Sequence, residues 1–558
     1  SAFGDLILSA TTAGTGAPEV NVTGAGLNIL DGDTTPQTAD GTAFGSADIT
    51  SGTVQKVFNI QNTGSATLSS IAVTTTNSEF GLLTAPPTTI AAGGNANFTI
   101  AFNPTATGLR AATLSFTNND ANENPYNFSL QGTGTSSGVI ADDLGAARGG
   151  VLTNATDGMC INMSPTPGSV SGYAQAVQDA GFKWTRQRLL WLGVEQSPGA
   201  YDFDGNSQTP NYDLMVSELN SRGIGVLFVI NLNNNPIYPG LAGSKPFNAA
   251  GRTNVANFAK AAAARYAGAK VMFELHNEPN IPNFWPVDGN GDGTVTIAEV
   301  QQAASDYAAL AQVVVPAMRS SGGDPNVFVI GPALAGRGGP YVGGQVGAHE
   351  YILKLKALNA LSPLFDRISL HLYTTHAFTG DTQPEEGPET AKIDFYRGLI
   401  NNPATNIMNT EQGWRTDGSA IENQLQASFN VRDHLFGLSK SVRFKCWFVW
   451  GNSPANAAFA IAGRPSETAA RILSQELATY RFSQRISTGN AEQYVLEFVN
   501  TAGNKRLAAW NTTTTTPATY NYAPAANKTR VELLGATSTI NSSGNLNLSI
   551  HPIYVRLP

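Results

Sequence analysis

Two glutamates that directly follow short apolar runs are the residues of this sequence best placed to do chemistry. Glu278 stands in the string VMFELHNEPN and Glu411 in the string IMNTEQGW. Two carboxyl groups that face each other can act as an acid and a nucleophile when their surroundings hold them in different protonation states. Hydrolysis of a glycosidic bond requires such a pair, because one carboxylic acid protonates the leaving oxygen while one carboxylate attacks the anomeric carbon.

Polar and aromatic residues at the ends of other apolar runs could complete a site of this kind. An arginine beside the nucleophile would keep it ionised, a tyrosine would bind its second oxygen, and an asparagine would bind a sugar hydroxyl. Tryptophan rings would stack on the faces of sugar rings. The candidates are Arg186, Asn277, His371, Tyr373 and Trp450, with Trp285 and Trp414 as further stacking residues.

Other assignments stay open for several of these positions. Arg188 shares a strand face with Arg186 and could be the arginine of the site in its place. Glu274 lies on the same strand face as Glu278, and we expect it to be the buried partner of an arginine. The histidine could equally be structural, and the two further tryptophans could equally be ordinary loop packing.

A second motif has the spacing of a calcium-binding loop. The string DGNGDGTVTIAE matches D-x-[DN]-x-[DN]-G-x5-E in full, with Gly293 at the sharp turn. No helix is expected before it, so it would be half of an EF-hand, with a helix starting near Ile297. A structural Ca²⁺ would stiffen the loop after Glu278, and a plain Asn/Gly turn is the alternative. The expected ligands are Asp288, Asn290, Asp292, Thr294, Thr296 and Glu299.

The pattern around these residues predicts the elements that must position them. Eight apolar runs alternate with helical patterns, which fits a (β/α)8 TIM barrel whose active site lies at the carboxyl ends of the strands. Glu278 would end the fourth strand and Glu411 the seventh. No glycine-rich phosphate turn supports a doubly wound sheet instead. The expected strands are Met159–Met163, Lys183–Arg188, Gly225–Leu232, Lys270–His276, Val327–Gly331, Arg367–Tyr373, Asn406–Thr410 and Arg443–Val449.

Alternating polar and apolar residues on both sides of the barrel predict two β-sandwiches. We expect an Ig-like sandwich over residues 1–135, the barrel over 136–482 and a C-terminal sandwich over 483–558. The string FNIQNTGSATLSSIAV resembles choice-of-anchor D and Hydin-type Ig-like modules, which implies contact with a cell surface or polysaccharide, or a spacer. The clearest N-terminal strands are Val54–Ile60, Thr67–Thr75, Asn97–Phe102 and Ala112–Phe116.

The combination of Asn277-Glu278-Pro279 with Glu411 resembles clan A of the retaining glycoside hydrolases. FELHNEPNIPNFW is similar to the family 39 signature, and FVIGPALAG, SLHLYT and NTEQGW fall where that family has them. The resemblance covers roughly residues 140–482. It implies that Glu278 is the acid/base and Glu411 the nucleophile, with carboxyl groups about 5–5.5 Å apart. His276 stands where the family usually has Trp, which leaves the sugar open.

Composition excludes other classes of protein. The 558 residues include 41 acidic and 33 basic side chains, for a net charge of −8, and no basic cluster, which argues against a nucleic-acid binder. No apolar run approaches the roughly 20 residues of a membrane span. Cys160 and Cys446 fall on the first and last barrel strands, so a disulfide and two buried thiols both stay open.

The sequence therefore predicts a retaining glycoside hydrolase that acts on β-glycosidic bonds of a poly- or oligosaccharide. The substrate would be a β-xyloside, a β-glucan or an exopolysaccharide, and we expect a secreted or cell-surface bacterial protein. The chain starts at Ser1 without a leader pattern, as a mature product would. The alternatives are a carbohydrate-binding or adhesion protein on a barrel scaffold and a transglycosylase that uses the same residues.

Overall fold

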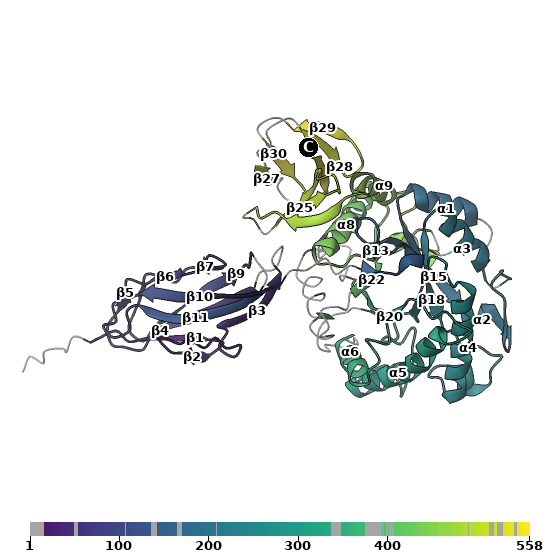
Figure 1. Cartoon of the computed structure of the whole chain (residues 1–558), viewed down its shortest axis with the longest axis horizontal. Helices are drawn as coiled ribbons and strands as arrows, with labels where there is room; N and C mark the ends of the chain where they lie inside the picture. Colours follow the sequence, from purple (N-terminus) through teal and green to yellow (C-terminus); the bar gives the residue numbers. More distant parts are fainter. Residues whose placement is uncertain are drawn as a thin grey trace, which may run out of the picture. The chain divides into compact units, whose positions relative to one another are not determined.

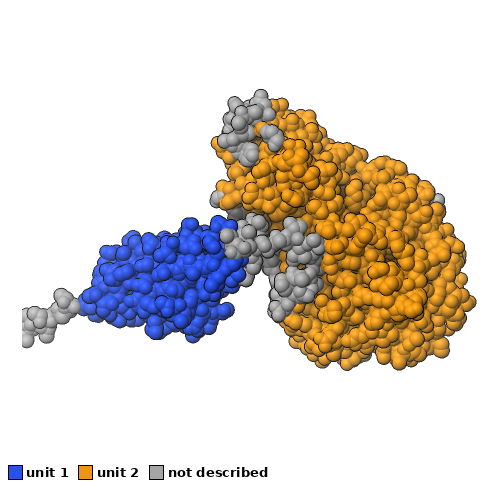
Figure 2. Space-filling view, viewed as in Figure 1, with its two compact units in different colours: residues 1–139 blue, residues 140–558 orange. Residues whose placement is uncertain are grey.

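The chain folds into two compact units, residues 1–139 and residues 140–558, which Figure 2 shows in different colours. None of the described helices is long and apolar enough to cross a membrane. The computed structural model describes residues 16–48, 54–105, 108–135, 142–163, 170–207, 209–335, 348–373, 385, 393, 396, 397, 400, 407–451, 454–488, 490, 492–512, 518–521, 528–540 and 544–557.

The first unit is an Ig-like sandwich of two β-sheets (Figure 1). Alternate residues of the long strands are buried, so the inner faces of the sheets share one apolar core. One sheet contains, in order, β2 (Leu27–Ile29), β1 (Val20–Gly24), β4 (Val54–Asn62), β9 (Asn95–Phe102) and β7 (Phe80–Thr84). The other contains β3 (Ala43–Asp48), β11 (Tyr126–Thr135), β10 (Gly108–Thr117) and β6 (Ala72–Thr75).

Phenylalanine rings fill the core of this sandwich. Phe58 stacks on Phe98 with ring centroids 5.4 Å apart, across the β4–β9 pair. The expected strand Thr67–Thr75 is wrong, because it forms two strands: β5 (Leu68–Ser69), which pairs with β8 (Thr89–Ile90), and β6. Ser70 between them has a φ of 61°, a left-handed conformation that ends the extended run.

The second unit contains a closed barrel of eight parallel strands, and each of the eight expected runs forms one of them (Figure 1). The barrel closes where the first strand pairs with the eighth. The strands are β14 (Met159–Asn162), β15 (Trp184–Leu190), β18 (Gly225–Asn231), β19 (Val271–Leu275), β20 (Val329–Ala335), β21 (Arg367–His371), β22 (Ile407–Gln412) and β23 (Lys445–Trp447).

Helices surround the barrel strands (Figure 1). The longest begins at Ile297, the position that the calcium-loop spacing predicts, because Thr296 and Glu299 form a capping box there. The helices are α1 (Val170–Asp179), α2 (Trp191–Val194), α3 (Tyr212–Ser221), α4 (Ala249–Arg265), α5 (Ile297–Arg319), α6 (Ala348–Ala357), α8 (Ala420–Ser439) and α9 (Pro465–Leu477), with 3-10 helices η1 (Ala146–Arg148), η2 (Gly240–Ala242) and η3 (Pro454–Phe459). Two short hairpins are β12 (Asp142–Asp143) with β13 (Val151–Leu152) and β16 (Glu195–Ser197) with β17 (Ala200–Tyr201).

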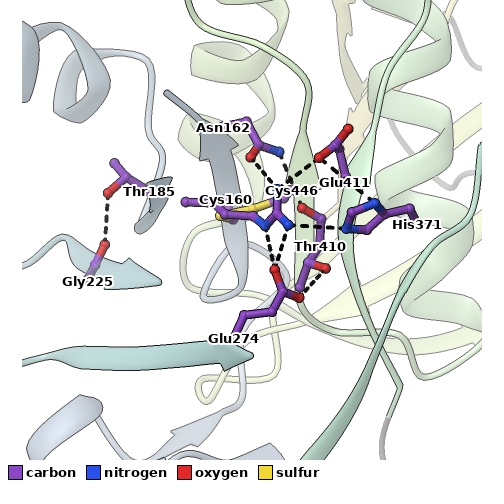
Figure 3. The surroundings of a disulfide bond; sticks show 10 residues. Cys160, Asn162, Thr185, Gly225, Glu274, His371, Thr410, Glu411 and Cys446 are labelled. Carbon is purple, nitrogen blue, oxygen red and sulfur yellow. Dashed lines mark hydrogen bonds and ion pairs between the residues drawn. A yellow bond between two sulfur atoms is a disulfide. The ribbon is translucent and has the colours of Figure 1, made fainter. Parts of the chain in front are cut away.

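The interior of the barrel is apolar at its floor and polar above it. The floor includes Trp184, Leu227 and the disulfide between Cys160 and Cys446, which lie side by side on neighbouring strands (Figure 3). Asn162 follows Cys160 by two residues and so projects into the next interior layer. The disulfide therefore joins the first and eighth strands directly below the polar layer.

A C-terminal β-sandwich packs on the barrel through α8. From Gln426 to Ser439 this helix is buried on every side, because it lies between the barrel and the sheet. Its buried charges are paired, with Asp433 bound to Lys445 at 2.5 Å. The six-stranded sheet contains β24 (Arg481–Arg485), β25 (Gln493–Val499), β26 (Lys505–Asn511), β31 (Ile553–Arg556), β28 (Lys528–Glu532) and β29 (Thr537–Ile540), and β27 (Ala518–Asn521) pairs with β30 (Asn545–Leu548).

Candidate active site

The two glutamates lie together at the carboxyl ends of the barrel strands. Glu411 belongs to β22, and Glu278 follows the last residue of β19 by three positions. One oxygen of Glu278, one ring nitrogen of His371 and one oxygen of Glu411 all lie within 4.8 Å of one another. Figure 3 shows His371 and Glu411 of this group. The two carboxylate side chains keep 12% and 14% of their surface exposed, so both can reach a bound molecule.

Both oxygens of Glu411 accept hydrogen bonds that favour the ionised form. Arg186 Nη1 donates to Oε2 at 2.8 Å, and the hydroxyl of Tyr373 donates to Oε1 at 2.9 Å. Burial raises the pKa of this carboxyl, but His371, Arg186 and the Tyr373 hydroxyl lower it more, so the pKa lies below its usual range. Glu411 is therefore a carboxylate at neutral pH.

Arg186 is the centre of the polar layer below the glutamates. It forms a buried ion pair with Glu274 at 2.6 Å, which confirms the expected structural role of that glutamate. Thr410 Oγ1 donates to the second oxygen of Glu274 at 2.7 Å, so this buried carboxylate has both oxygens bound. The guanidinium also donates to Oδ1 of Asn162 and Oδ1 of Asn277, which fixes its orientation toward Glu411.

His371 connects Glu278 to the same network. Its Nδ1 lies 2.8 Å from Glu278 Oε1, and its Nε2 lies 3.3 Å from Arg186 Nη2. Since an arginine nitrogen can only donate, the Nε2 of a neutral imidazole must accept, and the ring proton is then on Nδ1. With its proton on Nδ1, His371 donates to Oε1 of Glu278, which leaves the second oxygen of that carboxyl group outside this hydrogen bond.

A strained turn carries Glu278 into this position. His276 and Glu278 have φ values of 67° and 44°, a left-handed conformation that costs about 1–3 kcal/mol at each non-glycine residue. Burial, together with Lys245, lowers the pKa of His276 to about 3, so the ring is neutral. Its Nε2 donates to the Phe284 carbonyl at 2.9 Å, and its Nδ1 accepts from the Leu232 amide. The histidine thus ties the acid-bearing turn to β18.

The three expected tryptophans are buried and do not present their rings to a ligand bound at the glutamates. Trp285 is 1% exposed and packs against His276, and Trp414 is 2% exposed and packs against Phe429 below the C-terminal sheet. Trp450 is 6% exposed, and its ring meets the edges of Tyr173 and Phe182. All three indole rings are parts of the apolar packing.

Two aromatic residues that the sequence did not single out extend from Tyr373 instead. The half-buried ring of Phe459 lies 6.4 Å from the Tyr373 ring, and the half-buried Phe448 lies 5.4 Å from Phe459. Phe448 could have been found from the strand period, because it follows the interior residue Cys446 by two positions. Phe459 ends a 3-10 helix in a loop, where no period identifies an interior residue.

The predicted calcium loop forms a compact turn at the start of α5. Both oxygens of Asp288 accept loop amides, from Gly291 and Gly293, and these two glycines have φ values of 72° and 81°. Asp292 accepts from the Thr294 amide at 2.7 Å. The residue types, their spacing and the glycine conformations fit a hard, oxygen-binding cation.

Comparison with known families adds to this geometry. The model of the family described as "Cellulase (glycosyl hydrolase family 5)" matches residues 151–431, and that of the HYDIN/CFA65/VesB-like Ig-like domain matches residues 38–133. The expected resemblances of the barrel to clan A and of the first unit to Hydin-type modules are thereby confirmed. None of the curated proteins matches this chain.

Several solved structures are similar to this chain. A family 39 glycoside hydrolase from the gut symbiont Bacteroides cellulosilyticus WH2 is 20% identical with a TM-score of 0.56, over 93% of this chain and 99% of that one. A Bacteroides ovatus family 5 xyloglucanase in complex with a XXXG heptasaccharide is 14% identical (TM-score 0.33; 74% and 96% of the chains). An endo-1,4-beta-mannanase from Rhizomucor miehei is 15% identical (TM-score 0.39; 56% and 91%).

Proposed function

The chain belongs to glycosyl hydrolase family 5 and is a glycoside hydrolase, and we propose that it cleaves β-glycosidic bonds of a polysaccharide with retention of configuration. The observation that carries the proposal is the short separation of Glu278 and Glu411, whose nearest oxygens lie within 4.8 Å. Retaining enzymes have carboxyl groups about 5–5.5 Å apart, whereas inverting enzymes need about 6.5–9.5 Å to admit a water molecule.

In the first step Glu278 gives its proton to the leaving oxygen as Glu411 attacks the anomeric carbon. The glycosidic bond breaks, and a covalent glycosyl-enzyme forms at Glu411. In the second step Glu278, now a carboxylate, takes a proton from water, and the resulting hydroxide displaces Glu411 from the anomeric carbon. The network supports these roles, since Arg186 and Tyr373 stabilise the charge of Glu411 and His371 orients Glu278.

Asn277 supplies a donor for the sugar bound in this site. Its Oδ1 accepts from Arg186 at 2.7 Å, which turns the amide so that its nitrogen is on the other side. Within the described part of the chain this nitrogen makes no hydrogen bond. We propose that it donates to a hydroxyl of the reacting sugar, and that Phe448 takes the stacking role predicted for Trp450.

The test is a screen of β-xylan, β-glucan, mannan and bacterial exopolysaccharides, with the anomeric form of the first product followed by NMR. A β-product that later mutarotates supports retention, and an initial α-product would contradict it. Glu411→Gln should abolish turnover and keep binding. Binding by the unaltered protein without turnover would identify a carbohydrate-binding protein, and transfer to added acceptor sugars would identify a transglycosylase.

We also propose that the loop from Asp288 to Glu299 binds a structural Ca²⁺. The loop offers carboxylate, amide and carbonyl oxygens at the spacing of an EF-hand, and saturated oxygen ligation leaves no position for chemistry. It begins ten residues after Glu278 in the chain, so a bound ion would limit the motion of the segment that follows the acid.

Two further proposals concern where the enzyme works. The disulfide between Cys160 and Cys446 supports a secreted or cell-surface protein, because disulfides persist in oxidising compartments. The Ig-like unit is proposed to contact a polysaccharide or a cell surface. Removal of residues 1–139, which form a separate compact unit, should reduce binding to insoluble substrate but leave turnover of soluble substrate unchanged.

A further inference from the structure

One arginine at the barrel rim has no role in the network described above. On β15, Trp184 lies in the floor, Arg186 in the polar layer and Arg188 two residues further toward the rim. Side chains that alternate along a strand share one face, so Arg188 projects from the interior face of the strand, one layer above Arg186. It lies near enough to Glu411 for its charge to contribute to the low pKa of that carboxyl.

Arg188 is exposed, and its guanidinium has no partner among the residues that the structure describes. Arg186 and Arg148, by contrast, are paired, with Glu274 and Asp324 respectively. The two oxygens of Glu411 accept hydrogen bonds from Arg186 and Tyr373, and within the described part of the chain none comes from Arg188. Five N–H donors in a fixed planar fork are thus left open at the mouth of the site.

The neighbouring strand places a second open polar group at this rim. Arg188 is in register with Val229 of β18, and Asn231 follows Val229 on the same interior face. Asn231 is 6% exposed, and its side-chain amide makes no hydrogen bond within the described ranges. An arginine and an amide on adjacent strands, beside the reactive glutamates, form a donor-rich edge of the site.

Amides and hydroxyls are sufficient to bind a neutral sugar. A guanidinium group is instead suited to an anionic group with two or more oxygens. Arg binds carboxylate, sulfate and phosphate oxygens in pairs, through charge-assisted hydrogen bonds about twice as strong as neutral ones. Among the described residues of the site, the carboxylates of Glu274 and Glu411 outnumber the guanidinium of Arg186 even while Glu278 carries its proton. An anionic ligand would be repelled there unless a further cation faced it.

We propose that the polysaccharide substrate carries anionic groups, either uronate carboxylates or sulfate esters, and that Arg188, with Asn231 beside it, binds one of them next to the reacting sugar. The inference rests on the proposed function and narrows its substrate class. It assigns Arg188 a role in specificity, whereas Arg186 supports the nucleophile.

The test compares paired substrates with the same backbone: a neutral glycan, its uronate-bearing form and its sulfated form. For Arg188→Gln, kcat/KM on the preferred anionic form should fall relative to the neutral form by about 10- to 100-fold, mostly through KM. Arg188→Lys should lose less, because it keeps the charge. Raised salt should increase KM on the anionic form only. Arg471→Gln, an exposed arginine on α9, is the matched control and should keep the ratio unchanged.

The two anionic forms distinguish the source of the charge, and the form whose kcat/KM responds to Arg188 identifies it. Equal losses on neutral and anionic substrates would overturn the inference and show that Arg188 acts only on Glu411. Cleavage of neutral glycans without any cleavage of anionic ones would also overturn it. Failure to cleave any glycan would instead contradict the proposed function, so the two failures are distinguishable.

Discussion

Tyr373 donates its hydroxyl hydrogen to Oε1 of Glu411 at 2.9 Å, while Oε2 of the same carboxylate is bound by Arg186. The tyrosine stands just past the end of β21, and the glutamate belongs to the neighbouring strand β22. The protonation state of Glu411 therefore depends on a neutral donor as well as on a cation, and each can be changed separately.

Tyr373→Phe should move the acidic limb of the pH profile of kcat/KM to higher pH. The hydroxyl lowers the pKa of Glu411, so its loss raises that pKa, and the carboxylate needed for attack is then lost at a higher pH as the solution is acidified. The control is Tyr351→Phe, which removes a buried hydroxyl on α6 and should leave the limb in place. An unchanged limb in Tyr373→Phe would contradict the assignment of Glu411.

Glu278→Gln should separate substrates by their leaving groups. Loss of the proton donor should lower kcat on a polysaccharide by about 10²- to 10⁴-fold, but much less on an aryl glycoside whose leaving group needs no proton. Glu411→Gln should abolish turnover of both. Glu467→Gln, a change at a half-buried glutamate in the first turn of α9, is the control. Equal losses on both substrates for Glu278→Gln would contradict its role as the acid.

Arg186→Met should lower the free energy of unfolding by about 3–5 kcal/mol, because it leaves the charge of Glu274 buried without its partner. The double variant Arg186→Met/Glu274→Gln should recover part of that loss. Urea titration of the two single variants and the double variant would measure the coupling. Arg265→Met removes an ion pair to Asp213 whose arginine is 51% exposed, and it should lower the free energy of unfolding far less than Arg186→Met does. Strictly additive losses at 186 and 274 would contradict the coupling.

Calcium should raise the melting temperature of the chelator-treated protein. An ion present at 100 times its Kd adds about 2.7 kcal/mol to the free energy of unfolding. Asp288→Ala should remove the effect, whereas Asp306→Asn, on the same helix as Glu299 but outside the loop, should keep it. Calcium-independent melting of the unaltered protein would contradict the proposed site.

The barrel could be predicted because its strands are buried on both faces and form continuous apolar runs, as β18 does. Once the strands were assigned, the side chains at their carboxyl ends could be predicted to form one site. This prediction brought together Glu278, Glu411, Arg186 and Tyr373. The roles of the aromatic residues could not be predicted in this way. The sequence around a tryptophan such as Trp285 is the same whether its ring packs in a core or against a sugar. Only its neighbours, His276 and Tyr307, distinguish the two.

Two other features depended on tertiary structure. The cysteines were compatible with a disulfide or with thiols, because strand order alone does not fix the register that makes Cys160 and Cys446 direct neighbours. Arg186 and Arg188 lie on the same face of β15, because side chains two residues apart along a strand point the same way. This alternation does not say which of the two lies at the level of the glutamates' hydrogen-bond network. The ion pair of Arg186 with the buried Glu274 identifies Arg186 as the arginine of the polar layer.

The bond between Cys160 and Cys446 makes the barrel a covalent macrocycle. These residues are 286 positions apart, and the backbone between them passes through the strands from β14 to β23 before the sulfurs close the ring. A protease that cuts one connecting loop would therefore yield two fragments that stay joined by the disulfide and migrate as one species until it is reduced. If the chain were cut in one of those loops, Glu411 on β22 and Glu278 after β19 would still be joined covalently through the uncut part of the ring.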